Sequence, residues 1–184
     1  MQVQGGHEPK VVVFPGTAGL APRLDRGAIA TLLGGRVRTL RVVCGAMLGS
    51  ALLMAAASVV VVRALAAPPE VSTEVSLTLT CAAVVLILVT SRLHVAILAR
   101  AGRGTSATAN PAPAAAAVAD AYSRATILSF VILDAAAALG LVVAVVTGSV
   151  RYALVICGAA AIAMLARWPQ QAAAVRLLKR RGLA

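Results

Sequence analysis

The stretch VVCGAMLGSALLMAAASVVVV, residues Val42–Val62, decides the fold class of this 184-residue chain. It contains no charged residue and lies between Arg41 and Arg63. A helix crosses the hydrocarbon core of a bilayer with about 20 consecutive apolar residues, at about 1.5 Å per residue. The stretch therefore predicts a transmembrane helix. Because no cleavable signal pattern precedes it, we expect it to act as the insertion signal itself.

Three further apolar runs follow in the sequence. They cover residues 75–98, 125–147 and 151–167. The last run is short, but Tyr152 and Trp168 flank it as aromatic residues that suit the membrane interface. We therefore predict an all-α, polytopic membrane protein with four transmembrane helices arranged as two hairpins. The alternative, a soluble protein with long buried helical hairpins, fits poorly with four such runs in so short a chain.

The composition supports a membrane protein and argues against a nucleic-acid-binding one. Hydrophobic residues make up 60% of the chain, mean hydropathy is +0.93, and 12% of residues are charged, against about 25% in typical soluble domains. The net charge is +11, which suits nucleic acid or an anionic membrane surface. Aromatic residues make up only 3% of the chain, and the basic residues lie at the ends of apolar runs. We therefore expect the anionic lipids of the inner leaflet, and no nucleic acid, as partners.

The distribution of basic residues predicts the orientation. Of the 17 Lys and Arg residues, Arg63 and Arg151 alone fall outside if the N-terminus is cytoplasmic. This bias predicts that both termini lie in the cytoplasm. The composition, rich in arginine and alanine, suggests a bacterial protein, hence one of the inner membrane. We expect a basic N-terminal tail, a transmembrane domain with a flexible cytoplasmic linker, and a basic C-terminal tail that forms a short helix on the leaflet or merely sets topology. These three parts cover residues 1–40, 41–168 (linker 101–117) and 169–184.

Asp134 is the side chain that is hardest to explain in this scheme. It lies ten residues after Arg124, hence about 15 Å deep by helical rise. A carboxyl group there costs about 2.5–3.5 kcal/mol on insertion scales. We expect it to hydrogen-bond to a neighbour at similar depth, and the candidates are Ser50, Cys81 and Cys157. It is a candidate proton- or ion-binding group; the alternative is a structural contact between helices or with a partner subunit.

Small residues predict where helices approach each other. Gly45 and Gly49 form a Gly-x-x-x-Gly pair, and a second series recurs every four residues along the third helix. Its members are Ala136, Gly140, Ala144 and Gly148. Such ridges let helix backbones pack closely in lipid. The three cysteines, Cys44, Cys81 and Cys157, are expected to be small buried hydrophobic residues.

No pattern of an enzyme is visible in the sequence. It contains no phosphate-binding glycine loop, no His-Glu-x-x-His and no Gly-x-Ser-x-Gly motif. Ser50 and Ser129 are expected to lack a histidine at comparable depth, with His94 placed at the inner interface. We therefore predict a non-enzymatic protein without a metal or cofactor.

The third run, TILSFVILDAAAALGLVVAVV, resembles the proton-carrying outer helix of the rotary ATP synthase subunit c. In that family a lone carboxylate in mid-helix is followed by small residues. The resemblance implies that Asp134 binds a transported proton. The chain departs from the family because residues 75–91 lack a glycine ridge and a fourth helix follows the acidic one. The overall plan is also similar to small bacterial four-helix membrane proteins, which implies no activity.

Three functions are consistent with these observations. The leading one is a non-enzymatic accessory or assembly subunit of a larger membrane complex. The second is translocation of a proton or ion through Asp134, with a homo-oligomer as one arrangement. The third is a bundle that binds a lipid or a quinone.

Overall fold

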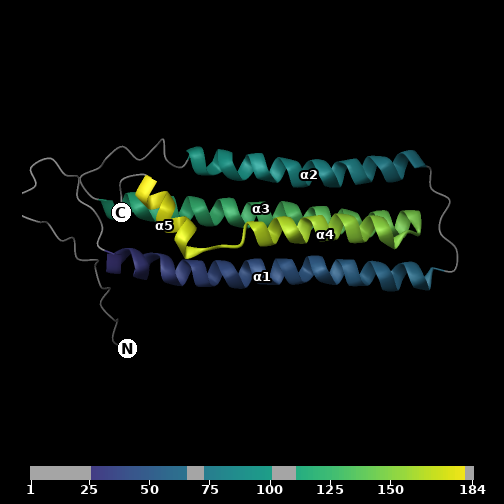
Figure 1. Cartoon of the computed structure of the whole chain (residues 1–184), viewed down its shortest axis with the longest axis horizontal. Coiled ribbons are helices and arrows are strands. Elements are labelled where there is room, and N and C mark those ends of the chain that lie inside the picture. Colours follow the sequence, from purple (N-terminus) through teal and green to yellow (C-terminus); the bar gives the residue numbers. More distant parts are fainter. Residues whose placement is uncertain (1–25, 66–72, 101–110, 181–184) are drawn as a thin grey trace, which may run out of the picture.

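The computed structural model describes residues 26–65, 73–100 and 111–180, which form five helices (Figure 1). They are α1 (Arg26–Ala64), α2 (Thr73–Arg100), α3 (Pro111–Thr147), α4 (Val150–Ala166) and α5 (Gln171–Arg180). The predicted all-α fold class is confirmed for these residues. The four apolar runs found in the sequence lie in the first four helices, in order, except that Arg167 follows the end of α4.

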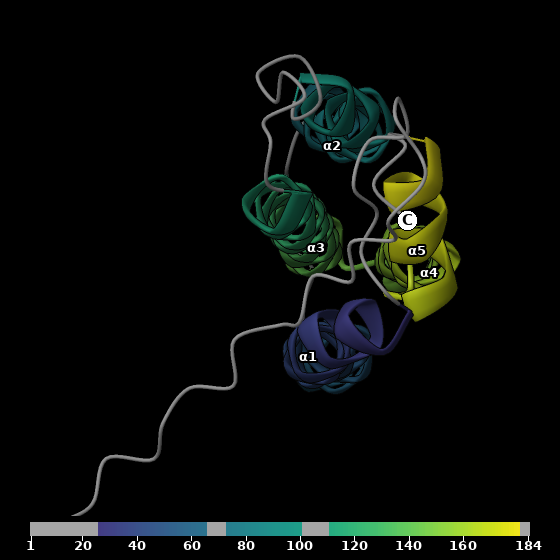
Figure 2. The same cartoon turned by 90° about the vertical axis from the view of Figure 1, so that its left-hand side faces the viewer.

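The first four helices run alternately up and down along the long axis of the molecule (Figure 1). α3 is central, because it packs against α1, α2 and α4. Within the described residues α1 and α2 do not touch, and an end-on view shows α3 and α4 between them (Figure 2). We call the end that holds the start of α1, the end of α2, the start of α3 and all of α5 the basic end (Figure 1). It carries most of the described basic residues.

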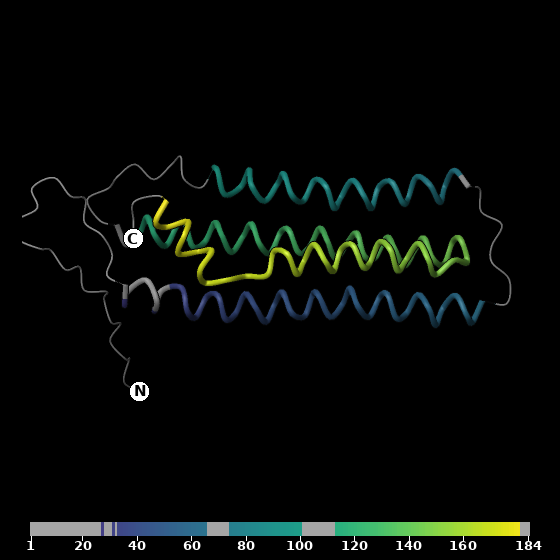
Figure 3. Tube along the Cα trace, in the orientation of Figure 1, coloured from purple at the N-terminus to yellow at the C-terminus, as the bar shows by residue number. Residues whose placement is uncertain are grey.

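Local sequence explains where the helices begin and break. α3 begins at Pro111, a residue that suits the first helical position because its missing N–H has no partner there anyway. Gly148 joins α3 to α4 with a φ of 63°, a left-handed conformation that favours glycine. Pro169 lies in the break between α4 and α5, across which the chain bends by 57° (Figure 3).

Three helices are long and apolar enough to cross a membrane. They are the segments Leu33–Ala64, Glu74–Arg100 and Pro113–Thr147. α4 has 17 residues, about 26 Å at the helical rise, and it reaches the length of a span only when it is taken together with α5 as one bent pair. The structure thus supports three candidate spans, and a fourth span remains a prediction.

Two helices extend beyond the boundaries that hydropathy predicts. α1 begins at Arg26 and α3 at Pro111. Residues 26–40 of the predicted basic tail are therefore helical, and residues 111–117 of the predicted flexible linker belong to α3. The rest of the predicted tail and linker, residues 1–25 and 101–110, lies outside the described residues. We call residues 26–41 of α1 and 111–124 of α3 the helix extensions.

Packing between the helix extensions explains why they are helical. Leu33 and Leu40 recur on one face of α1 and belong to the same buried cluster as Val118 of α3. An ion pair between Arg36 and Asp120 joins the two extensions from outside this cluster. The spacing of the leucines is helical, so a buried apolar stripe holds this part of α1 in helical form despite its arginines.

The C-terminal segment is a docked helix rather than a free tail. α5 confirms the predicted short basic helix, but Ala174 and Leu178 are buried in the main core cluster, and α5 packs against α1 and α3. The Arg41 Nε donates a hydrogen bond to the Pro169 carbonyl over 3.1 Å. This bond ties the connector before α5 to α1, so residues 171–180 are docked on the bundle. That the charges of this segment set topology stays a prediction.

Candidate functional site

Asp134 lies in the second half of α3 (Pro111–Thr147). Its side chain is partly buried, and its Oδ1 atom is buried without a hydrogen-bond partner among the described residues. A buried polar atom left without a partner costs about 1–3 kcal/mol. Asp134 is therefore the described residue whose side chain carries a buried oxygen without a hydrogen-bond partner.

The structure does not bring together the hydrogen-bond partners predicted for Asp134. Cys157 is buried in α4 and donates its thiol to the Ala137 carbonyl, with Sγ and O 3.4 Å apart. Cys81 is exposed, so the prediction that it is buried is wrong. The reason is that α2 turns Ala83 toward the bundle, and Cys81 points elsewhere. Ser50 is partly buried on α1, and no described hydrogen bond joins it to Asp134.

One member of the small-residue series on α3, Gly140, makes a close contact with α4. A Cβ atom added at Gly140 would lie 3.1 Å from the Ile156 Cγ2 and 3.2 Å from the Cys157 Sγ. Ala136 and Ala144 are buried as well, and Gly148 lies in the turn described above. A ridge along the whole series stays a prediction.

The glycine pair predicted on α1 makes no comparable contact. An added Cβ at Gly49 would meet nothing within 4 Å, and one at Gly45 would meet only the Trp168 ring, at 3.7 Å. The prediction that these two glycines bring helices into close contact is therefore wrong within the described chain. A Gly-x-x-x-Gly pair permits a close approach but does not require one.

A histidine does lie beside Ser129, contrary to the sequence-based expectation. The His94 Nδ1 is 3.0 Å from the Ser129 Oγ, and the Ser129 hydroxyl donates to the Ala125 carbonyl over 2.7 Å. Ser129 lies only five residues past Arg124, so it is much shallower than Asp134. Ser129 is 1% exposed, and its contact with His94 joins α2 to α3.

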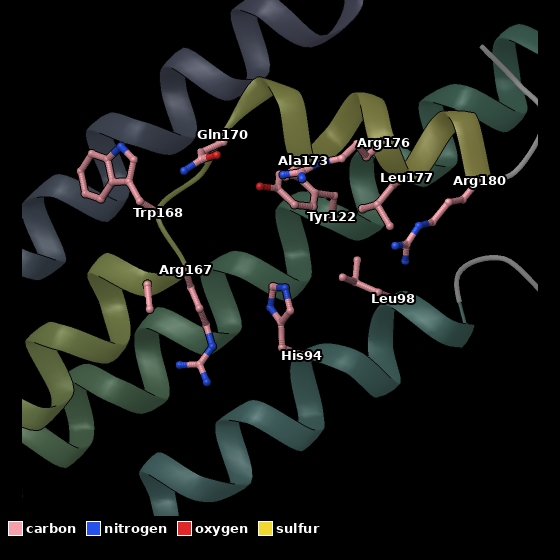
Figure 4. Close-up of a pocket in the computed structure, with 11 residues that line it drawn as sticks. His94, Leu98, Tyr122, Arg167, Trp168, Gln170, Ala173, Arg176, Leu177 and Arg180 are labelled. Atoms are coloured by element: carbon pink, nitrogen blue, oxygen red, sulfur yellow. The ribbon is translucent and has the colours of Figure 1, made fainter.

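A cleft opens beside this histidine at the basic end (Figure 4). It has a volume of about 480 Å³ and is bounded by α2, α3, α5 and the connector 167–170. Its lining includes His94, Leu98, Tyr122, Arg167, Trp168, Gln170, Arg176, Leu177 and Arg180. We call it the basic cleft. Three arginines and no carboxylate line it, so an anion is the complementary ligand.

Hydrogen bonds hold one of these arginines in place. Arg167 donates through Nη2 to the Ser91 Oγ over 2.5 Å and through Nη1 to the Ala163 carbonyl over 3.4 Å. Among the described residues the structure holds one ion pair, between Arg36 and Asp120. Arg176 and Arg180 therefore face the cleft without a described carboxylate partner, which leaves their guanidinium groups for an incoming anion.

Sequence reasoning missed the basic cleft because its walls come from distant segments. The available signal was local: Arg176 and Arg180 are four residues apart, so they lie on one side of a short helix. The sequence analysis did not predict the break at Pro169. This break turns the side of α5 that carries the two arginines toward α2 and α3.

Comparison with protein-family models, curated proteins and solved structures finds no match to this chain. The fold and the two sites therefore rest on the chain's own residues. The resemblance of the third apolar run to subunit c remains a hypothesis.

Proposed function

We propose that this chain is a non-enzymatic accessory or assembly subunit of a larger membrane complex. It resides in the inner membrane of a bacterium, crosses it four times, and keeps both termini and the basic end in the cytoplasm. The positive-inside bias supports this orientation, because the described charges at the opposite end are limited to Arg63, Glu74 and Arg151.

The proposal is supported mainly by how few side chains α2 buries against the rest of the bundle. α2 has 28 residues, yet among its described side chains only Ala83 and Thr90 are buried. It does not touch α1, and its main contact is α3. Large apolar side chains such as Leu88, which is 63% exposed, cover its outer face. A span held mainly by one neighbour suits a chain whose membrane packing is completed by another subunit.

Photocrosslinking inside the membrane tests this function. A photoreactive amino acid at Leu88 is expected to give one discrete protein adduct, which also co-purifies in mild detergent. The matched control is the same amino acid at Val155 of α4, which is 71% exposed and is expected to give lipid adducts only. If Leu88 also gives only lipid adducts and the purified chain is a stable monomer, the proposal is wrong.

A second candidate function, proton or ion translocation through Asp134, is favoured by one specific observation. The Asp134 Oδ1 is buried and has no described hydrogen-bond partner, so the carboxyl group retains capacity to bind a proton or a cation. Ionisable residues inside membrane spans commonly mark such pathways. In this proposal several copies of the chain assemble so that Asp134 of each copy is reached in turn.

Carbodiimide labelling distinguishes the two candidates. A hydrophobic carbodiimide is expected to label Asp134 in membranes, and Asp134→Asn is expected to abolish both labelling and proton flux in vesicles. Asp120 is the matched control, because it lies on the same helix but is exposed and paired with Arg36. Unchanged proton flux in Asp134→Asn vesicles would remove the translocation proposal and leave the accessory role standing.

A further inference from the structure

We infer that the basic cleft binds the phosphate group of an anionic phospholipid of the surrounding bilayer. The inference concerns a site remote from Asp134, and it does not depend on whether the chain is an accessory subunit. It rests on three features: the charge of the cleft, its depth, and the apolar side chains in its lining.

The charge of the cleft selects a phosphate. Arg176 and Arg180 come from successive turns of α5, and Arg167 comes from the connector. Guanidinium groups present several N–H donors in a fixed plane that matches the oxygens of a phosphate. The neutral donors of Tyr122 and Gln170 lie in the same lining and add hydrogen-bonding capacity without charge. No carboxylate in the lining opposes an anion.

The depth of the cleft matches the headgroup region. Its lining begins at Ala166, where α4 ends, and Figure 4 shows Trp168 at the start of the connector that follows. Tryptophan and tyrosine concentrate at the boundary between hydrocarbon and water. The cleft therefore lies where the apolar part of the bundle stops, at the level where phospholipid phosphates are found.

Apolar side chains in the cleft make a lipid a better fit than free phosphate. Leu98 of α2 and Leu177 of α5 lie in the same lining as the arginines. A free phosphate would use only the arginines, whereas a phospholipid also contacts these apolar side chains.

Native mass spectrometry of the detergent-solubilised protein tests the inference. The probes are phosphatidylglycerol and phosphatidylcholine with identical acyl chains, and inorganic phosphate. The wild-type protein is expected to retain one phosphatidylglycerol in preference to phosphatidylcholine. Inorganic phosphate in molar excess is expected to leave that lipid bound.

The double variant Arg176→Gln, Arg180→Gln is expected to bind phosphatidylglycerol about 30-fold more weakly, since each basic residue at the surface contributes about fivefold. The control double variant, Arg124→Gln with Lys179→Gln, removes the same charge from exposed positions outside the cleft. Its affinity is expected to change by about twofold or less, because exposed charges at a distance are screened.

The replacement Arg176→Lys with Arg180→Lys guards against a folding artefact, because it keeps the charge and is expected to keep most of the lipid preference. Three results would each overturn the inference. They are equal retention of the two lipids by the wild-type protein, an equal loss in the cleft and control variants, and displacement of the lipid by inorganic phosphate, which would assign the cleft to free phosphate.

Discussion

Arg167 and Ser91 form a hydrogen bond of 2.5 Å that ties the end of α4 to α2. The two helices pack far less closely with each other than each does with α3. Polar contacts of this kind have a large relative effect in a bundle where apolar burial alone does not drive association, because lipid is as apolar as the helix surface.

Removal of this bond is expected to loosen α2. Ser91→Ala should lower the free energy of unfolding by about 1 kcal/mol, the usual worth of a hydrogen bond between membrane helices. Reversible unfolding in mixed micelles measures the change. Ser123→Ala is the control, because the Ser123 hydroxyl bonds within its own helix, to the Ala119 carbonyl. Equal effects of the two substitutions would show that the bond to Arg167 does not hold α2.

The contact between α3 and α4 predicts opposite behaviour for two glycines. In Gly49→Ala the new methyl group meets nothing within 4 Å, so the variant should gain up to about 1 kcal/mol from helix propensity. In Gly140→Ala the methyl group would press on Ile156, whose branched side chain has essentially one rotamer in a helix. Overpacking costs about 1–3 kcal/mol, so Gly140→Ala should be clearly less stable than Gly49→Ala. The same stability in both would contradict the packing described for α3 and α4.

Docking of α5 depends on one leucine that is 1% exposed, Leu178. Leu178→Asp is expected to weaken docking by at least about 2 kcal/mol, or roughly 30-fold in the population of the open state. Trypsin cleavage after Arg176 should accelerate accordingly in detergent. Ala172→Asp introduces the same charge at an exposed position of α5 and should leave the cleavage rate unchanged. If trypsin cleaves the Leu178→Asp variant no faster than the wild-type protein, Leu178 does not hold α5 in place.

The proposed orientation predicts which end of α2 faces the outside of the cell. Glu74 and Arg100 are exposed at opposite ends of this helix. In a background with the three native cysteines replaced by alanine, Glu74→Cys should react with a membrane-impermeant thiol reagent in intact cells. Arg100→Cys should react only after the cells are opened. The reverse pattern would invert the topology, and labelling of both would show that α2 does not cross the membrane.

Much of the fold is predictable from hydropathy because the apolar runs are long and their ends are marked by arginines. The helix boundaries are harder to predict where charged residues lie within a helix. Arg36 and Arg41 interrupt the hydropathy of α1, whereas Leu33 and Leu40 continue its buried face. A hydropathy average therefore ends the helix at the arginines, whereas the helical spacing of the leucines shows that it continues.

Of the two sites, one could be predicted from the sequence and the other could not. Asp134 is visible in the sequence because a single charge in an apolar run is conspicuous, but its surroundings depend on how the helices rotate against one another. The basic cleft depends on a bend at Pro169 and on contacts between segments as distant as His94 and Arg180. The contact between His94 and Ser129 was missed because depth was judged from position in a run rather than from helix pairing.

The two carboxyl groups of α3 lie on one continuous helix. Asp120 and Asp134 are 14 residues apart, about 21 Å along its axis, with no proline or break between them. Any shift of α3 as a whole therefore moves both carboxyl groups together, so a displacement at the ion pair of Arg36 with Asp120 also changes the position of Asp134.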